Sequence, residues 1–122
     1  MAENKGVMIC SEIVDGRMAA VTTELLGGGR KLADELGEDL SAVLMGSGVS
    51  NFAKEAIAYG ADKAYVIDDP LLKDYQTDSY TAVMEKLVKE VAPKVLLMGQ
   101  TPMGRDLAPR LSFRLGIGVS MD

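Results

Sequence analysis

Short apolar runs alternate along the chain with longer segments in which apolar residues recur every three or four positions. The runs are four to six residues long, which is typical of strands buried on both faces of a parallel sheet. The longer segments have the spacing of helices that bury one face. The predicted strands cover residues 7–10, 40–45, 63–67 and 95–98, and a fifth is predicted to begin within residues 116–120.

The clearest helix follows a loop over residues 71–76 and begins where Thr77 or Asp78 can cap it. Its apolar residues fall at i, i+3, i+4, i+7, i+8 and i+11, a broad stripe that faces a core, and Pro93 ends it. The stripe consists of Tyr80, Val83, Met84, Leu87, Val88 and Val91. A shorter helix is predicted over about residues 51–59, capped by Ser50.

A helix over residues 19–36 contains the triplet Gly27-Gly28-Gly29, and Gly37 is its natural stop. Each glycine costs up to about 1 kcal/mol in a helix relative to alanine. Either packing holds this helix together, with glycine letting a neighbouring backbone come close, or the helix breaks into two pieces. A nucleotide-binding loop is disfavoured because the triplet lies within a helix rather than at a strand end.

The alternation of strands and helices predicts an α/β fold, a three-layer sandwich with a mainly parallel sheet and right-handed crossovers. The connections are short, and no repeat, low-complexity stretch or linker interrupts the 122 residues. We therefore predict a single α/β domain over residues 1–122.

Pro109 decides where the last helix is predicted to begin. A start at Thr101 would leave Pro109 in the helix interior, at a cost of up to about 3 kcal/mol. A start near Arg105 or Asp106 puts Pro109 in the first turn, where a missing N–H matters little. The second start is the prediction, and residues 101–104 then form a loop.

That loop would lie at the carboxyl end of a parallel strand, where helix N–H groups and the helix dipole favour anions. Thr101, Gly104 and Arg105 are therefore the candidate contacts for a phosphate or a nucleotide. The alternative is that Gly104 is a packing glycine, that Arg105 pairs with Asp106 or another local acid, and that nothing binds. The sequence does not match the phosphate-binding motif GxxxxGK[ST].

Three arginines, Arg105, Arg110 and Arg114, lie partly on one flank of the same helix. Such a flank can meet a phosphate or an acidic partner, although a solvated face is the commoner outcome. The chain as a whole carries 13 Lys plus Arg against 18 Asp plus Glu, a formal net charge of −5. This balance argues against nucleic acid as the principal partner, because nucleic-acid binding requires a basic face.

Cys10 is the only cysteine, and the chain has no histidine. An intrachain disulfide, the usual zinc sites and the Ser-His-Asp and Cys-His arrangements are therefore excluded within this chain. Cys10 lies in an apolar run and is predicted to be a buried, inert thiol. We expect a protein without catalytic residues of its own, rather than an autonomous enzyme.

Two further motifs have plain structural interpretations. Gly46-Ser47-Gly48 begins a GxGxxG-like pattern, but Asn51 replaces the third glycine, so a tight strand-to-helix turn is predicted. Asp68 and Asp69 could bind a metal, but no third ligand is evident, and we interpret them as turn acids. No apolar run is long enough to cross a bilayer, and residues 1–6 do not resemble a signal peptide, so we expect a cytoplasmic protein without membrane insertion.

Several segments resemble the alpha subunit of electron transfer flavoprotein, in that family's order and over nearly the whole chain. The most specific is TPMGRDLAPRL at residues 101–111. The others are a strand followed by an acid at residues 7–12, the stretch YGADKAYV at residues 59–66, and residues 118–122. This resemblance implies a fold shared with adenine-nucleotide-binding domains, the adenine-nucleotide-hydrolase-like or Rossmann-like class, and with the family's beta subunit.

The resemblance also implies a role as a scaffold. The domain would pair with the beta subunit in a heterodimer and support flavin-mediated electron transfer from flavin-dependent dehydrogenases to an acceptor. In the family, FAD sits mainly on a second, carboxy-terminal domain that these 122 residues do not contain, so no FAD is expected on this chain alone. Residues 101–105 correspond to the place where the beta subunit holds the phosphate of AMP or a second flavin. AMP is therefore a candidate ligand, and a free-standing nucleotide-binding domain is the alternative function.

Overall fold

One parallel sheet of five strands forms the centre of the computed structural model, which describes residues 4–115 and 119–121. The spatial order is β5-β4-β1-β6-β7, and every neighbouring pair is parallel. The strands are β1 (Val7–Cys10), β4 (Leu40–Gly46), β5 (Lys63–Asp68), β6 (Val95–Met98) and β7 (Ser120–Met121). The four predicted apolar strands are confirmed. A fifth strand is also present, while residues 116–118 lie outside the described part of the chain.

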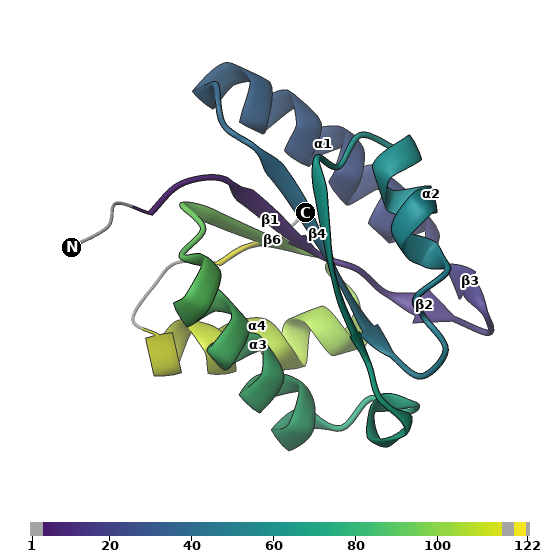
Figure 1. Ribbon diagram of the computed structural model, residues 1–122. Helices are drawn as coiled ribbons and strands as arrows, with labels where there is room; N and C mark the ends of the chain where they lie inside the picture. Colours follow the sequence, from purple (N-terminus) through teal and green to yellow (C-terminus); the bar gives the residue numbers. More distant parts are fainter. Residues whose placement is uncertain (1–3, 116–118, 122) are drawn as a thin grey trace.

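Helices cover both faces of this sheet (Figure 1). One face carries α1 (Ala20–Leu36) and α2 (Phe52–Ala58), and the other carries α3 (Thr77–Val91) and α4 (Pro102–Leu115). A 3-10 turn, η1 (Pro70–Leu72), precedes α3. The prediction of a three-layer α/β sandwich is confirmed.

Strand β1 shows why its residues read as a continuous apolar run. Val7 and Ile9 belong to the core beneath α1 and α2, whereas Met8 and Cys10 belong to the core beneath α3 and α4. Successive side chains of a strand point to opposite faces, so a strand covered on both faces needs apolar residues at every position.

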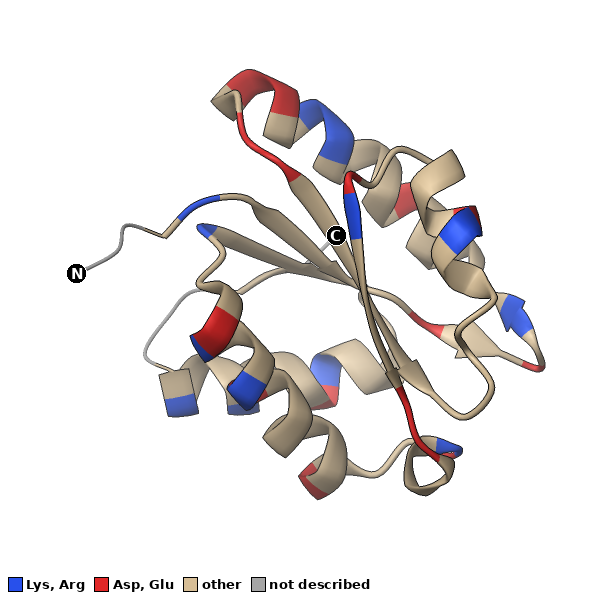
Figure 2. Cartoon of the chain, in the orientation of Figure 1, with Lys and Arg blue, Asp and Glu red and all other residues tan. Residues whose placement is uncertain are grey.

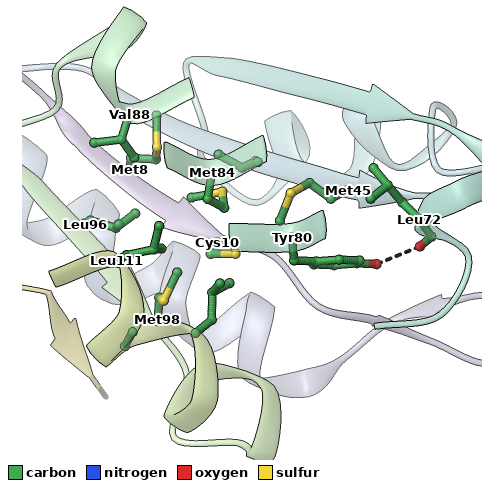
Figure 3. Packing of buried hydrophobic residues seen from close by; sticks show 13 residues of the cluster. Met8, Cys10, Met45, Leu72, Tyr80, Met84, Val88, Leu96, Met98 and Leu111 are labelled. Atoms are coloured by element: carbon green, nitrogen blue, oxygen red, sulfur yellow. Dashed lines mark hydrogen bonds between the residues drawn. The ribbon is translucent and has the colours of Figure 1, made fainter. Parts of the chain in front are cut away.

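The core beneath α3 and α4 is rich in methionine (Figure 3). Met8, Met45, Met84 and Met98 are all buried there, together with Leu111 of α4. Tyr80 of α3 is also buried, and its hydroxyl donates to the Leu72 carbonyl oxygen at 2.7 Å. The apolar stripe predicted for α3 is confirmed, since Met84 and Val88 are buried with Tyr80.

A small β-hairpin that the sequence pattern did not predict joins β1 to α1. Its strands, β2 (Ile13–Val14) and β3 (Arg17–Met18), pair antiparallel. Asp15 and Gly16 form the turn with φ values of 51° and 72°, as the left-handed turns of two-residue hairpins require. Strands of two residues are too short to show an alternating pattern.

The glycine triplet lies within an unbroken α1, so packing holds the helix together. Gly29 is buried against the sheet: a Cβ on this residue would lie 2.8 Å from Leu40 Cδ1 and 3.2 Å from Ile9 Cγ2. Gly27 is exposed and has open space at the corresponding position. Only Gly29 of these two is needed for the close approach of α1 to the sheet.

Replacing these two glycines by alanine should therefore have different effects. Gly27→Ala is expected to raise the free energy of unfolding by about 0.5–1 kcal/mol through helix propensity alone. Gly29→Ala gains the same propensity but crowds Leu40 and Ile9, and it should be less stable than Gly27→Ala by about 1–3 kcal/mol. Urea unfolding of both variants measures this difference, and equal stabilities would show that Gly29 is not a packing glycine.

The predicted start of the last helix is wrong, because α4 begins at Pro102 and contains Pro109 in its interior. Thr101 stabilises this earlier start: its hydroxyl oxygen accepts from the Gly104 N–H at 3.1 Å, and its carbonyl accepts from the Arg105 N–H at 2.8 Å. Gly104 is also buried. Capping and burial of this first turn outweigh the hydrogen bond that Pro109 removes.

Two predicted caps are also wrong, because their hydroxyls bond to carboxylates distant in sequence. The Ser50 hydroxyl donates to Asp68 Oδ2 at 2.8 Å instead of capping α2. The Thr77 hydroxyl donates to Asp106 Oδ2 at 2.6 Å, and α3 is preceded by Gln76, which makes no side-chain capping bond.

Candidate functional site

The loops after β1 and β6 meet at the carboxyl edge of the sheet, where the candidate anion site was predicted. Thr101 lies at their junction, and its hydroxyl donates to Glu12 Oε2 at 2.5 Å. The Thr101 hydroxyl oxygen in turn accepts from the Gly104 N–H. A carboxylate of the chain itself therefore lies at the N-terminus of α4, where the helix dipole favours negative charge.

Glu12 is held in this place by hydrogen bonds that its backbone N–H and carbonyl groups make with Thr22 and Ala19. Its N–H donates to Thr22 Oγ1 at 2.8 Å, and the Thr22 hydroxyl in turn lies 3.1 Å from the Glu12 carbonyl oxygen, to which it donates. The Glu12 carbonyl also accepts from the Ala19 N–H at 2.9 Å. Gly99 leaves room for the carboxylate, since a Cβ on Gly99 would lie 3.3 Å from Glu12 Oε2.

Few N–H groups remain at the start of α4 for an external anion. Pro102 has none, and those of Gly104 and Arg105 bond to Thr101. Within the described part of the chain, the N–H of Met103 is the one left in the first turn without an acceptor. Phosphate-binding helix starts present several converging N–H groups, and this one does not.

The structure thus brings Thr101, Gly104 and Arg105 together through backbone N–H bonds to Thr101, but the Arg105 side chain takes no part in them. Arg105 is exposed, and among the described residues its side chain makes no hydrogen bond or ion pair. Asp106, the partner offered by the alternative interpretation, instead bonds to Tyr75, Thr77 and Arg110. Glu12 was not among the predicted site residues, although an acid directly after a buried strand was the available signal.

Asp106 ties the start of α3 to α4. Its Oδ2 accepts from the Tyr75 hydroxyl at 2.7 Å and from the Thr77 hydroxyl at 2.6 Å. These two hydroxyls, chiefly that of Thr77, lower the pKa of the Asp106 carboxyl. Burial, followed by the bond to Asp106, raises the pKa of Tyr75 to about 12. The cluster is a structural brace with every polar group paired.

Asp68, the last residue of β5, places its carboxylate in the glycine-containing turn that follows β4. Its carboxylate accepts from three successive backbone N–H groups, those of Gly48 (2.8 Å), Val49 (2.9 Å) and Ser50 (3.1 Å), and from the Ser50 hydroxyl. The Ser50 hydroxyl and then the Gly48 N–H lower the pKa of Asp68. The neighbouring Asp69 caps η1 through a bond from the Leu71 N–H at 2.9 Å. Asp69 is a turn acid, as interpreted from the sequence, whereas Asp68 ends strand β5 and bonds to the turn after β4.

Acid titration should reveal the role of Asp68. Because its pKa is lowered in the folded state, its stabilising contribution is present above the ordinary carboxyl pKa and is lost as the pH falls through the folded value. We expect Asp68→Asn to lower the free energy of unfolding at neutral pH and to flatten its decline between about pH 5 and about pH 3.

Urea unfolding at several pH values measures this decline, with Asp69→Asn as the matched control. Asp69 accepts one backbone N–H where Asp68 accepts three and a hydroxyl, so the control should change stability less. Parallel pH curves for the wild type and Asp68→Asn would contradict the assignment.

The remaining candidate residues lie in ordinary structural surroundings. Burial raises the pKa of the Cys10 thiol to about 12, which agrees with the prediction of a buried, inert cysteine. Among the described residues, no group of three or more potential metal ligands is assembled. No helix in that part of the chain is long and apolar enough to span a membrane.

Comparison with solved structures defines the fold class. The Archaeoglobus fulgidus universal stress protein in complex with dAMP aligns with a TM-score of 0.63 at 11% identity, covering 98% of each chain. Another structure of the universal stress protein from this organism aligns with a TM-score of 0.64 at 10% identity, covering 98% of this chain and 93% of that one. The predicted adenine-nucleotide-hydrolase-like fold is therefore confirmed.

Comparison of sequences then gives the family, because the electron transfer flavoprotein domain model matches residues 7–122. The chain belongs to the electron transfer flavoprotein family. It is 44% identical to the electron transfer flavoprotein subunit alpha of Thermoanaerobacterium thermosaccharolyticum over 100% of this chain and 37% of that protein. It is 43% identical to the Megasphaera elsdenii subunit alpha over 100% of this chain and 36% of that protein.

A third relative carries a more specific name. The acryloyl-CoA reductase electron transfer subunit beta of Anaerotignum propionicum is 43% identical over 97% of this chain and 32% of that protein. The chain thus spans about a third of the length of the curated relatives it matches.

Proposed function

We propose that the chain is the amino-terminal domain of an electron transfer flavoprotein alpha subunit and acts as a scaffold. In this role it pairs with the beta subunit and supports flavin-mediated electron transfer from dehydrogenases to an acceptor. The observation that carries the proposal is the 44% identity to a named alpha subunit over the whole chain, although the chain covers 37% of that subunit. We further propose a cytoplasmic location and no catalytic residues within the domain.

The chemistry of the chain supports a scaffold. Histidine is absent and the single thiol is buried. The carboxylates Glu12, Asp68 and Asp106 are engaged in bonds that hold loops and helices together. FAD would be held mainly by the part of the alpha subunit that these residues do not include.

Pairing with the beta subunit is the direct test. The chain and a separately purified cognate beta subunit would be mixed and passed through size exclusion with light scattering. The proposal expects a one-to-one heterodimer, whereas separate elution of the two proteins at high micromolar concentration would refute it.

The alternative is a nucleotide-binding domain that uses Thr101, Gly104 and Arg105, with AMP as the candidate ligand. The exposed Arg105 beside the start of α4 favours it, and the universal stress protein of similar fold was solved with dAMP. The Glu12 carboxylate opposes it, because that group already bonds to Thr101.

Titration with AMP separates the two functions. If the loop is a nucleotide site, Glu12→Gln should raise AMP affinity by removing a negative charge, and Arg105→Ala should abolish binding. Mass analysis of any small molecule released on denaturation of the purified chain supplies an independent answer. No released nucleotide and no AMP binding by either wild type or Glu12→Gln would reject the alternative.

A further inference from the structure

We infer that the outer face of α4 is the surface through which this domain docks an acidic, partly apolar surface of its protein partner. This inference rests on the proposed function, in which the partner is the beta subunit. The face is defined by Arg105, Pro109 and Phe113, called here the α4 outer stripe.

The stripe is a single ridge that points away from the rest of the molecule. Its three residues are four positions apart, so their side chains lie along one row of the helix. All three are exposed, whereas the opposite side of α4, with Leu107 and Leu111, is buried in the core. Large side chains thus lie on both sides of α4: leucines on the side that faces the core, and an arginine and a phenylalanine on the side that faces solvent.

Phe113 is the strongest sign that the stripe is normally covered. Its side chain is 91% exposed, more than any other large hydrophobic residue among those described. The exposed positions of α3, the neighbouring helix in the same layer, are Asp78, Ala82, Lys86, Lys89 and Glu90. An exposed phenyl ring in line with an exposed arginine has the composition of an interface centre, where Phe and Arg are enriched.

A second row, beside the stripe, supplies additional positive charge. Arg110 pairs with Asp106 at 3.5 Å and Arg114 pairs with Glu85 of α3 at 3.1 Å, yet both arginine side chains remain more than half exposed (53% and 54%). Each guanidinium has further N–H donors for another carboxylate. These pairs hold the arginines in place along the edge of the stripe.

The charge of α4 is opposite to that of the chain. The helix carries three arginines against one aspartate, whereas the whole chain has a net charge of −5 (Figure 2). A local cationic row beside an exposed phenyl ring matches a partner surface on which carboxylates surround an apolar pocket. An extended polyanion would instead require a broad basic face, which an acidic chain with one cationic helix does not offer.

Binding of the chain to the cognate beta subunit, measured by isothermal titration calorimetry, tests the stripe. Phe113→Ala and Arg105→Glu should each raise the dissociation constant by at least about ten-fold, since aromatic and arginine anchors dominate interface energetics. Raising the salt from about 0.05 M to about 0.5 M should weaken the wild type more than Arg105→Glu, because a screened charge pair no longer contributes.

Matched controls lie on α2 and at its C-terminal end, on the opposite face of the sheet (Figure 1). Tyr59→Ala removes an aromatic side chain that is 52% exposed, and Lys54→Glu reverses an exposed charge. Both should change the dissociation constant by less than about two-fold. All four variants alter exposed positions, and unchanged thermal unfolding would show that they remain folded.

The outcomes separate this inference from the proposed function. If the wild type binds the beta subunit and the α4 variants bind equally well, the stripe is not the docking surface and the scaffold function stands. If the controls on the α2 side weaken binding instead, the docking surface lies on the other layer and the inference fails. If the wild type does not bind at all, both fail. Tight binding of anionic vesicles in place of the beta subunit would also overturn the inference that the α4 outer stripe is a protein-docking surface.

Discussion

Leu111→Ala is expected to lower the free energy of unfolding by about 2–5 kcal/mol, the range for truncating a fully buried leucine. Leu111 is 0% exposed and lies in the core that joins α4 to the sheet (Figure 3). A domain of this size has a free energy of unfolding of about 5–15 kcal/mol, so this single substitution removes a large part of it.

The methionines around Leu111 determine how large the loss of stability on Leu111→Ala is within the range of about 2–5 kcal/mol. Met8, Met84 and Met98 are buried in the same cluster, and unbranched thioether side chains can shift to fill part of a cavity. We therefore expect the lower half of the range. A value near its upper limit would indicate that these methionines are held rigidly.

Phe113→Ala is the matched control on the same helix. It removes a larger apolar side chain, but from a position that is 91% exposed, and it should change the free energy of unfolding by less than about 0.5 kcal/mol. Urea unfolding followed by circular dichroism measures both variants. Similar losses for the two would contradict the assignment of an inner and an outer face to α4.

Regular elements were predictable because their causes are local. The strand at residues 95–98 is an apolar run covered on both faces, and the stripe from Tyr80 to Val91 repeats with the helical period. Both patterns extend over enough residues to be read without knowledge of the tertiary structure. The family resemblance depended on sequence likeness rather than on these patterns, and the family match over residues 7–122 supports it.

The carboxylate contacts were not predictable because they join residues far apart in the chain. Glu12 and Thr101 are 89 residues apart, and Asp68 lies 18 to 20 residues from the N–H groups it accepts. Each helix start was therefore interpreted from its local candidates. The local pattern predicts Ser50 as a cap, but its hydroxyl bonds to Asp68, and Pro109 predicts a late start for α4, which begins at Pro102.

Two segments with the features of an anion site, the start of α4 and the turn after β4, each lie against a carboxylate of the same chain. Glu12 lies at the start of α4, and Asp68 accepts the N–H groups of the turn after β4. In the turn after β4 the Asp68 carboxylate satisfies three N–H donors without a ligand, whereas at the start of α4 Glu12 accepts from the Thr101 hydroxyl.

Pro109→Ala is expected to raise the free energy of unfolding by about 2 kcal/mol, an unusual direction for a substitution in a helix. Proline is about 3 kcal/mol less favourable than alanine in a helix interior, because it lacks an N–H and crowds the preceding turn. Alanine would restore the bond to the Arg105 carbonyl. The greater freedom of alanine in the unfolded chain offsets about 0.4–1 kcal/mol of this gain.

Pro102→Ala provides the comparison, because Pro102 is the first residue of α4, where proline is well accommodated. Its removal should leave stability unchanged or slightly lower. Pro109 is exposed, so little packing is lost with its ring. If Pro109→Ala proved no more stable than the wild type, the turn around Arg105 would not regain its hydrogen bond, and α4 would behave as a helix whose strongly held part begins near Asp106, as its sequence suggested.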